Sequence, residues 1–169
     1  MTTKQVVLCT PVRTAIGTYN GSLKDVPGTD LGATVIRETL KRSGLAADQI
    51  QTVVMGNVIQ AGNKMNPARQ AAIGAGLPVN IPAMTVNRVC GSGAQGVVSA
   101  ALEVWSGMID CAIGGGMENM DRAPYLLPQA RWGARMGDVT AFDSMLYDGL
   151  NDAFSGKHSG WHTEDLVTL

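Results

Sequence analysis

Short apolar runs that alternate with segments of helical periodicity are the feature that most constrains the fold of this chain. The apolar runs span residues 6–9, 50–59, 83–89 and 109–113. Bounded runs of this kind predict buried strands, whereas apolar residues three or four positions apart predict one face of a helix. Strands that alternate with helices form right-handed βαβ units, so we expect an α/β fold with a mostly parallel sheet.

Three helices are predicted between these runs. The first starts at Thr29 or Asp30, either of which can serve as an N-cap, and ends near Arg42 before a serine–glycine pair. The second follows Asn66, a good N-cap, and has a proline at its first position. The third carries its apolar residues along one face over positions 94–105.

The alternating pattern ends at three consecutive glycines, residues 114–116, which are predicted to close the last strand. Residues 117–161 are rich in Met, Arg, Asp, Gly and Pro and have no clear period. An irregular stretch of this length exceeds an ordinary connection between elements. We therefore expect a functional or interfacial insertion after the α/β part.

Charge and composition exclude several classes of function. The 169 residues include 13 basic and 14 acidic side chains, which argues against a nucleic-acid partner. No stretch of 18 apolar residues is present, so we expect no membrane partner. The N-terminal apolar run is too short for a signal peptide, which favours a cytoplasmic location.

The cysteines do not suggest a disulfide framework or a zinc site, because there are three of them and none form a CxxC pair. Cys9 and Cys111 lie within apolar runs and are predicted to be small buried side chains. Cys90 differs from both because its neighbours are not typical of a core.

A glycine cluster, GSGAQG at residues 91–96, formally matches the G-x-G-x-x-G dinucleotide fingerprint. Glu118 even lies near the distance expected for an acid that binds the ribose. However, the cluster follows the third strand instead of the first, and Asn87 and Arg88 suit a buried nucleotide-binding strand poorly. The dinucleotide interpretation is therefore the weaker one.

Cys90 itself is the stronger candidate, because it lies where a strand is predicted to end and a helix to begin. The unpaired amides and the dipole of a helix N-terminus favour a thiolate. Glycines after the cysteine permit a sharp turn, and backbone amides there can stabilise an oxyanion. Cys90 is thus a candidate nucleophile for acyl transfer, and the alternative is a buried structural cysteine before a tight turn.

Four segments in order carry a resemblance to the thiolase family that covers residues 6–166. They are CTPVRTAIGTYNGSL, MGNVIQAGNKMNPARQAA, VNRVCGSGAQ and GGGMENMDRAPYLLPQARWGARMGD. The last is most similar to thiolases that form acetoacetyl-CoA. The resemblance implies that Cys90 is acylated by acetyl-CoA and that a second acetyl-CoA then yields acetoacetyl-CoA and CoA, reversibly. Coenzyme A thioesters would be the substrates, and no separate cofactor is implied.

The resemblance also implies that part of the catalytic machinery lies elsewhere. Thiolases have about twice this length, and their NEAF-like, GHP-like and CxG-like segments do not occur here. We expect a thiolase-like α/β half without its last strand over residues 1–116, and the start of a substrate-covering loop domain over 117–169. The chain would be the nucleophile-bearing subunit or fragment of an acetyl-CoA C-acetyltransferase. Its expected partner is a second polypeptide with the C-terminal half, in a hetero-oligomer.

The segment DAFSGKHSGWHTEDL is similar to the acyl-pocket stretch of the family. By position, His158 would lie near the thioester oxygen, and Ser159 would replace a methionine beside the acyl group. Ser159 leaves a longer-chain 3-ketoacyl-CoA thiolase open, and the missing segments leave a non-catalytic binding or scaffold subunit open. A metal site from His158 and His162 is not expected, because Gly160 lies between them and no third ligand is evident.

Overall fold

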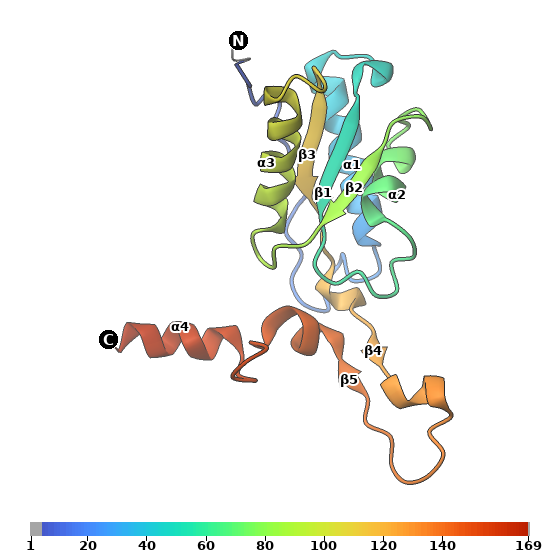
Figure 1. The fold of residues 1–169 in the computed structure, drawn as a ribbon, viewed down its shortest axis with the longest axis vertical. Helices are drawn as coiled ribbons and strands as arrows, with labels where there is room; N and C mark the ends of the chain where they lie inside the picture. The colour runs from blue at the N-terminus through green and yellow to red at the C-terminus, as the bar shows by residue number, and fades with distance from the viewer. Residues whose placement is uncertain (1–4, 169) are drawn as a thin grey trace. The chain divides into compact units, whose positions relative to one another are not determined.

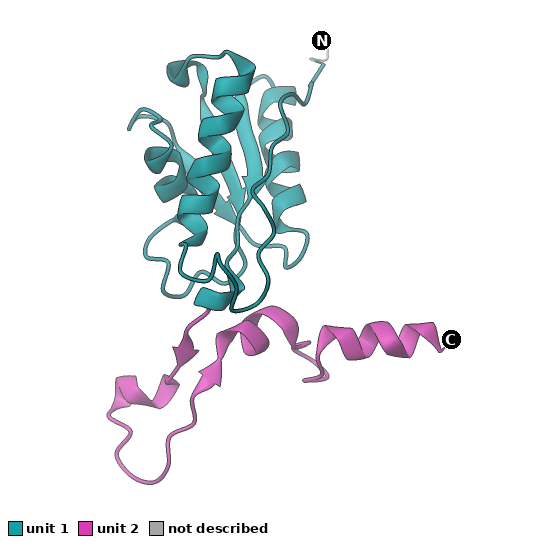
Figure 2. Ribbon diagram, turned by 180° about the vertical axis from the view of Figure 1, so that it is seen from behind, with its two compact units in different colours: residues 1–122 teal, residues 123–169 magenta. Residues whose placement is uncertain are grey.

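The computed structural model describes residues 5–168, and the outermost positions of the predicted ranges 1–116 and 117–169 lie outside that description. The chain forms two compact units, residues 1–122 and residues 123–169, which Figure 2 shows in different colours.

Unit 1 is built on a parallel sheet of three strands in the order β2-β1-β3 (Figure 1). The strands are β1 (Thr52–Gly56), β2 (Ala83–Val86) and β3 (Ala112–Gly116). Val53 of the central strand pairs with Ala83 on one side and Ile113 on the other. This arrangement confirms the predicted α/β class and its parallel sheet.

Helices cover both faces of this sheet (Figures 1 and 2). α1 (Gly28–Ser43) and α2 (Pro67–Gly74) pack against each other on one face, and α3 (Ser92–Trp105) covers the other. The connecting segments contain two 3-10 turns, Ala47–Gln49 and Met120–Arg122. The central strand β1 is buried along its whole length, as its continuous apolar run predicts, whereas the flanking strands β2 and β3 are partly exposed.

Local sequence signals identified two of the three predicted helix ends correctly. The Asn66 side chain accepts a hydrogen bond of 3.2 Å from the Arg69 backbone N–H at the start of α2. α1 ends at Gly44, whose left-handed φ of 70° lets its N–H reach the Leu40 carbonyl. The predicted start of α1 is wrong, because Pro27 occupies the N-cap and no side chain caps this end. Proline sets its own φ near the helical value and needs no partner for an N–H it lacks.

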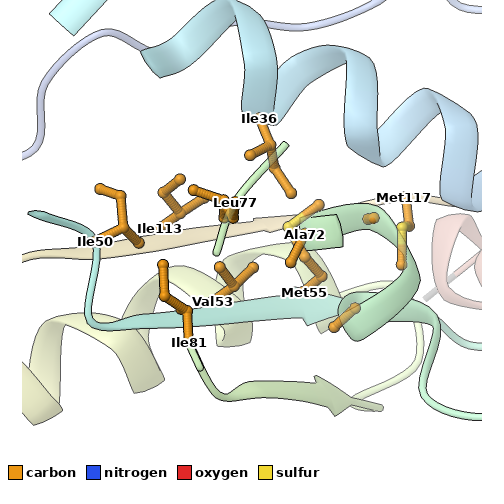
Figure 3. Packing of buried hydrophobic residues seen from close by; sticks show 11 residues of the cluster. Ile36, Ile50, Val53, Met55, Ala72, Leu77, Ile81, Ile113 and Met117 are labelled. Atoms are coloured by element: carbon orange, nitrogen blue, oxygen red, sulfur yellow. The ribbon is translucent and has the colours of Figure 1, made fainter. Parts of the chain in front are cut away.

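The core of unit 1 lies between the sheet and the pair α1 and α2 (Figure 3). Val53 and Met55 of β1 are 0% and 1% exposed, and Ile36 of α1 is 1% exposed. Small side chains on α2, including Ala68 and Ala72, let α1 pack closely against it. Burial of each large apolar side chain stabilises the fold by about 1.5–3 kcal/mol.

Residues 6–9 do not form the predicted strand. Val7 and Leu8 are 79% and 76% exposed, and Cys9 is exposed instead of buried. The segment lines one wall of a cavity of about 820 Å³, and β3 lines another wall. Apolar residues of α1 and α3 complete the lining, among them Val35, Leu40, Val97 and Val104. A strand needs a neighbour within hydrogen-bonding distance, and the cavity separates this segment from β3.

Unit 2 contains short elements in place of the predicted irregular stretch. β4 (Tyr125–Leu126) and β5 (Phe142–Asp143) are antiparallel. A 3-10 turn (Pro128–Trp132) follows β4, a π-helical turn (Met145–Leu150) follows β5, and α4 (Ser159–Val167) comes last. The buried Ser144 hydroxyl donates a 2.6 Å hydrogen bond to the Pro124 carbonyl. This bond links the start of β4 to the end of β5.

None of the helices in residues 5–168 combines the length and the apolar character that crossing a membrane requires.

Candidate active site

Cys90 lies in the turn between β2 and α3, and its side chain is exposed. Gly91 is the N-cap of α3, so the cysteine comes one residue before the cap. The Gly91 N–H donates to the Arg88 carbonyl at 3.1 Å, and the Gln95 N–H donates to the Gly91 carbonyl at 2.8 Å. The predicted junction of strand end and helix start is therefore present around Cys90, and the thiol is open to an incoming ligand.

The residue before Cys90 has an unusual backbone. Val89 has a φ of 47°, a conformation that β-branched residues seldom adopt. Its N–H donates to the Asn87 side-chain oxygen at 2.9 Å, and its carbonyl accepts from the Ser92 hydroxyl at 2.6 Å. Ser92 is only 4% exposed and also accepts from the Arg88 N–H at 2.8 Å. Local side chains thus hold the chain in a sharp turn where the thiol is presented.

Close contact between α3 and the sheet explains one glycine of the cluster, Gly96. A Cβ added to Gly96 would lie 2.4 Å from the Gly115 carbonyl oxygen, so this position needs a glycine for packing. By contrast, a Cβ on Gly91 or Gly93 would meet its nearest neighbour at 3.4 or 3.7 Å. The last glycine of the apparent fingerprint therefore serves helix–sheet packing.

The same contact corrects the predicted boundary of the last strand. The glycines at 114–116 lie inside β3 instead of closing it. A Cβ on Gly114 would lie 2.7 Å from the Val97 Cα, which leaves no room for a side chain where α3 crosses β3.

Glu118 lies just beyond β3 and binds the loop that follows β1. Its Oε1 accepts from the Asn57 side-chain amide at 2.7 Å, and its Oε2 accepts from the Val58 N–H at 2.7 Å. Burial raises the pKa of Glu118, and hydrogen bonds from the backbones of Val58 and Ile59 and from Asn57 oppose this shift. Both carboxylate oxygens are used within the protein, so this side chain is a structural anchor at the carboxyl end of the sheet.

The two other predicted site residues, His158 and Ser159, lie side by side in unit 2. His158 is the N-cap of α4, and its Nδ1 accepts from the Gly160 N–H at 2.9 Å. In the neutral ring, this hydrogen bond leaves Nε2 as the nitrogen that carries the proton. Ser159 is the first residue of α4, and both side chains are exposed.

His162 has partners of its own in unit 2. Its Nε2 lies 2.8 Å from the Ser155 hydroxyl and 3.9 Å from an Asp152 carboxylate oxygen. A hydrogen bond from the Ser155 backbone lowers the pKa of Asp152. Within residues 5–168, no three side chains of the metal-binding types come together.

The sequence patterns missed Asn57, Asn87 and Ser92 as parts of the site. Asn87 was visible only as a polar residue in a predicted buried strand, and β2 in fact ends one residue before it, at Val86. Polarity at the end of a parallel strand is therefore the signal that could have identified it. Asn57 and Ser92 carried no signal, because their partners are distant in sequence or are backbone atoms of the same turn.

Comparison with known proteins gives matches over most of the chain. Residues 6–168 match the family model described as thiolase, N-terminal domain. The acetyl-CoA acetyltransferase of Pseudomonas aeruginosa is 48% identical over 164 residues, which cover 97% of this chain and 42% of that protein. Beta-ketothiolase BktB of Cupriavidus necator is 52% identical over 166 residues, with coverage of 98% and 42%. A probable acetyl-CoA acyltransferase of Staphylococcus aureus is 47% identical over 163 residues, with coverage of 96% and 42%. The chain thus spans about 42% of the length of these curated relatives.

Proposed function

The chain belongs to the thiolase family, and from this premise we propose that it is the nucleophile-bearing part of an acetyl-CoA C-acetyltransferase. The observation that carries the proposal is the exposed Cys90 on its hydrogen-bonded turn before α3. The names of two relatives at 47–48% identity, acetyl-CoA acetyltransferase and probable acetyl-CoA acyltransferase, support the choice of acyl-CoA substrates.

In the proposed reaction, the Cys90 thiolate attacks the thioester carbonyl of acetyl-CoA. A bond forms between the Cys90 sulfur and the acetyl carbon, the bond from that carbon to the CoA sulfur breaks, and CoA leaves as a thiol after taking up a proton. The α-carbon of a second acetyl-CoA, after loss of a proton to a base, attacks the acetyl group, and the Cys90 thiolate leaves. The products are acetoacetyl-CoA and CoA, and no further cofactor takes part.

Cys90 performs only part of this reaction, because proton transfer at the α-carbon requires a base. The NEAF-like, GHP-like and CxG-like segments that the resemblance assigns to such groups are not among these 169 residues. We propose that polypeptide outside these residues supplies them. In the relatives, the matching region is part of one longer chain. We propose a separate polypeptide, in a hetero-oligomer with this chain, as one source of the missing segments.

His158 and Ser159 have proposed roles in binding the acyl-CoA. With its Nδ1 occupied by Gly160, the ring of His158 offers its Nε2–H as a donor to a thioester oxygen. Ser159 would lie beside the acyl group and leave more room there than a methionine would. The small side chain of Ser159 favours a second candidate function, namely a thiolase for longer 3-ketoacyl-CoA chains, and a relative at 52% identity is named beta-ketothiolase.

Acetyl transfer to Cys90 is the direct test. The chain is incubated with acetyl-CoA alone and with a polypeptide equivalent to the remaining part of the Pseudomonas relative, and the acetyl group is located by peptide mass spectrometry. We expect acetylation of Cys90 with release of one equivalent of CoA, and none in C90S. C111S, which alters the half-buried cysteine of unit 1, is the matched control and should react like wild type. Absence of acetyl-Cys90 in both arms would contradict the enzyme and favour a binding or scaffold role.

Acetylation in the absence of the added polypeptide would show that Cys90 needs no separate chain for the first step.

We also propose a cytoplasmic location, which fractionation of the source cells would test.

A further inference from the structure

We propose that Asn87 is a positioning residue for Cys90, because its side-chain amide ties the turn that presents the thiol to the loop anchored by Glu118. The proposal rests on the proposed function of Cys90 as the acyl acceptor. Asn87 itself does not touch the reacting atoms in this scheme and acts through the backbone of Val89.

The first link joins Asn87 to the turn. The Asn87 Oδ1 accepts from the Val89 N–H at 2.9 Å, and Val89 is the residue with the left-handed φ of 47° directly before Cys90. Residues other than glycine keep a left-handed backbone only where surrounding contacts hold it in place. The Ser92 hydroxyl holds the other end of Val89 by donating to its carbonyl at 2.6 Å. The backbone direction into Cys90 is therefore fixed from both sides.

The second link joins Asn87 to the loop after β1. The Asn87 Nδ2 donates to the Val58 carbonyl at 3.3 Å, and the Val58 N–H donates to Glu118 at 2.7 Å. Asn57, which is 2% exposed, completes the anchor with side-chain hydrogen bonds to Glu118 at 2.7 Å and to the Met117 carbonyl at 3.3 Å. Asn87, which directly follows β2, thus links the nucleophile turn to the residues just beyond β1 and β3.

Asn87 differs in its exposure from residues that only maintain the fold. The side chain is exposed and contributes no apolar contact to the core, whereas Ser92 is buried under the turn. Removal of the Asn87 amide should therefore leave global stability nearly unchanged and alter the geometry at Cys90. Once Val89 leaves the left-handed region, the backbone no longer presents the thiol in this turn, and we expect the reaction rate of Cys90 to change.

The test compares N87A with N80A in the full chain by the rate of iodoacetamide alkylation of Cys90 at neutral pH. Asn80 is an exposed asparagine in the turn before β2 and serves as the matched control. Peptide mass spectrometry gives the rates for Cys9 and Cys111 as internal references, and urea unfolding confirms that each variant is folded. We expect N87A to slow alkylation of Cys90 about five- to tenfold, the effect of one net hydrogen bond. N80A should stay within about twofold of wild type, since it removes no contact of the turn.

A double variant shows whether Asn87 acts through the backbone of Val89. Glycine adopts a positive φ without strain, so V89G should make the turn less dependent on Asn87. We expect N87A to change the Cys90 rate less than twofold in the V89G background, as removal of the strain predicts. A rate for N87A equal to wild type, or an equal loss in both backgrounds, would overturn the positioning role.

Acetylation by acetyl-CoA, measured on the same variants, keeps this proposal distinct from the proposed function. If wild type is alkylated at Cys90 with the expected dependence on Asn87 but is never acetylated, the positioning of the thiol stands and the acyltransferase assignment fails. If wild type is acetylated and N87A is acetylated equally fast, the assignment stands and the positioning role fails.

Discussion

The carboxylate of Glu118, just beyond β3, accepts a hydrogen bond of 2.7 Å from the side-chain amide of Asn57, just beyond β1. The pair joins two neighbouring parallel strands at their carboxyl ends, and the Cys90 turn begins at the same end of the sheet. Burial raises the pKa of Glu118 even though backbone and side-chain donors surround its carboxylate. The anchor of the candidate site therefore titrates differently in the folded and unfolded chain.

This raised pKa predicts a specific pH dependence of stability. The folded state holds the Glu118 proton more tightly than the unfolded chain, whose reference value is 4.5. The stabilisation is fully present below that value and is lost as pH rises through the folded-state pKa. We expect the free energy of unfolding of wild type, minus that of E118Q, to fall as pH rises from about 4 to 7. Paired urea titrations check this, and a difference that grows with pH would contradict it.

Cys90 should be the first of the three cysteines to react with iodoacetamide at neutral pH. It is exposed before a helix N-terminus, whereas burial raises the pKa of Cys111 and reduces its thiolate fraction. Cys9 is exposed as well but lies in an extended segment away from a helix end, so we expect it to rank second. Peptide mapping over time gives the order, and faster labelling of Cys111 would remove the basis for the nucleophile assignment.

Gly96 should be intolerant of alanine although helix propensity favours the change by about 1 kcal/mol. The added Cβ would lie 2.4 Å from the Gly115 carbonyl oxygen and 2.9 Å from that of Val54, and neither backbone atom can move freely. We expect G96A to lower the free energy of unfolding by about 1–3 kcal/mol, as overpacking does. G93A, with its nearest neighbour at 3.7 Å, is the matched control and should be neutral or stabilising. Urea unfolding of both variants and wild type measures these changes in the free energy of unfolding.

The choice of acyl chain should depend on Ser159. A small polar side chain at the start of α4 leaves space that a methionine would fill, so longer 3-ketoacyl chains should be accepted. We expect S159M to reduce thiolysis of a six-carbon 3-ketoacyl-CoA more than thiolysis of acetoacetyl-CoA, by roughly tenfold for the loss of one or two methylene sites. The assay uses the chain together with the remaining part of a thiolase. Strict preference of wild type for acetoacetyl-CoA would show that another residue limits the pocket.

The chain by itself should self-associate and lack thiolase activity. The side of β3 that faces away from β1 borders the 820 Å³ cavity, and no other described strand pairs with β3 there. Open edges and apolar cavities favour pairing with another chain, over an area on the order of 2,000 Å² for an obligate contact. We expect concentration-dependent association in sedimentation velocity, and weaker association for V104K, which places a charge in the cavity wall. A stable monomer with thiolase activity would contradict this prediction.

The sequence by itself determined the features that depend on residues within one turn of each other. Asn66 begins α2 and Gly44 ends α1 because capping needs only a side chain or a positive φ near the helix end. The apolar residues of β1, β2 and β3 were likewise visible as short bounded runs, and β1 is buried on both faces. The place of Cys90 between a strand and a helix followed from the same local patterns.

Only the tertiary structure decided which apolar runs pair and which groups meet at the candidate site. Residues 6–9 have the composition of a strand, yet they lie across a cavity from β3 and belong to no strand of the part of the chain that the structure describes. Gly114 continues β3 because α3 leaves no room for a side chain, and the link between Asn87, Val58 and Glu118 joins residues that are 29 and 60 positions apart. Hydrogen bonds and close contacts of this kind depend on the distance between segments in space, and local propensity carries no information about that distance.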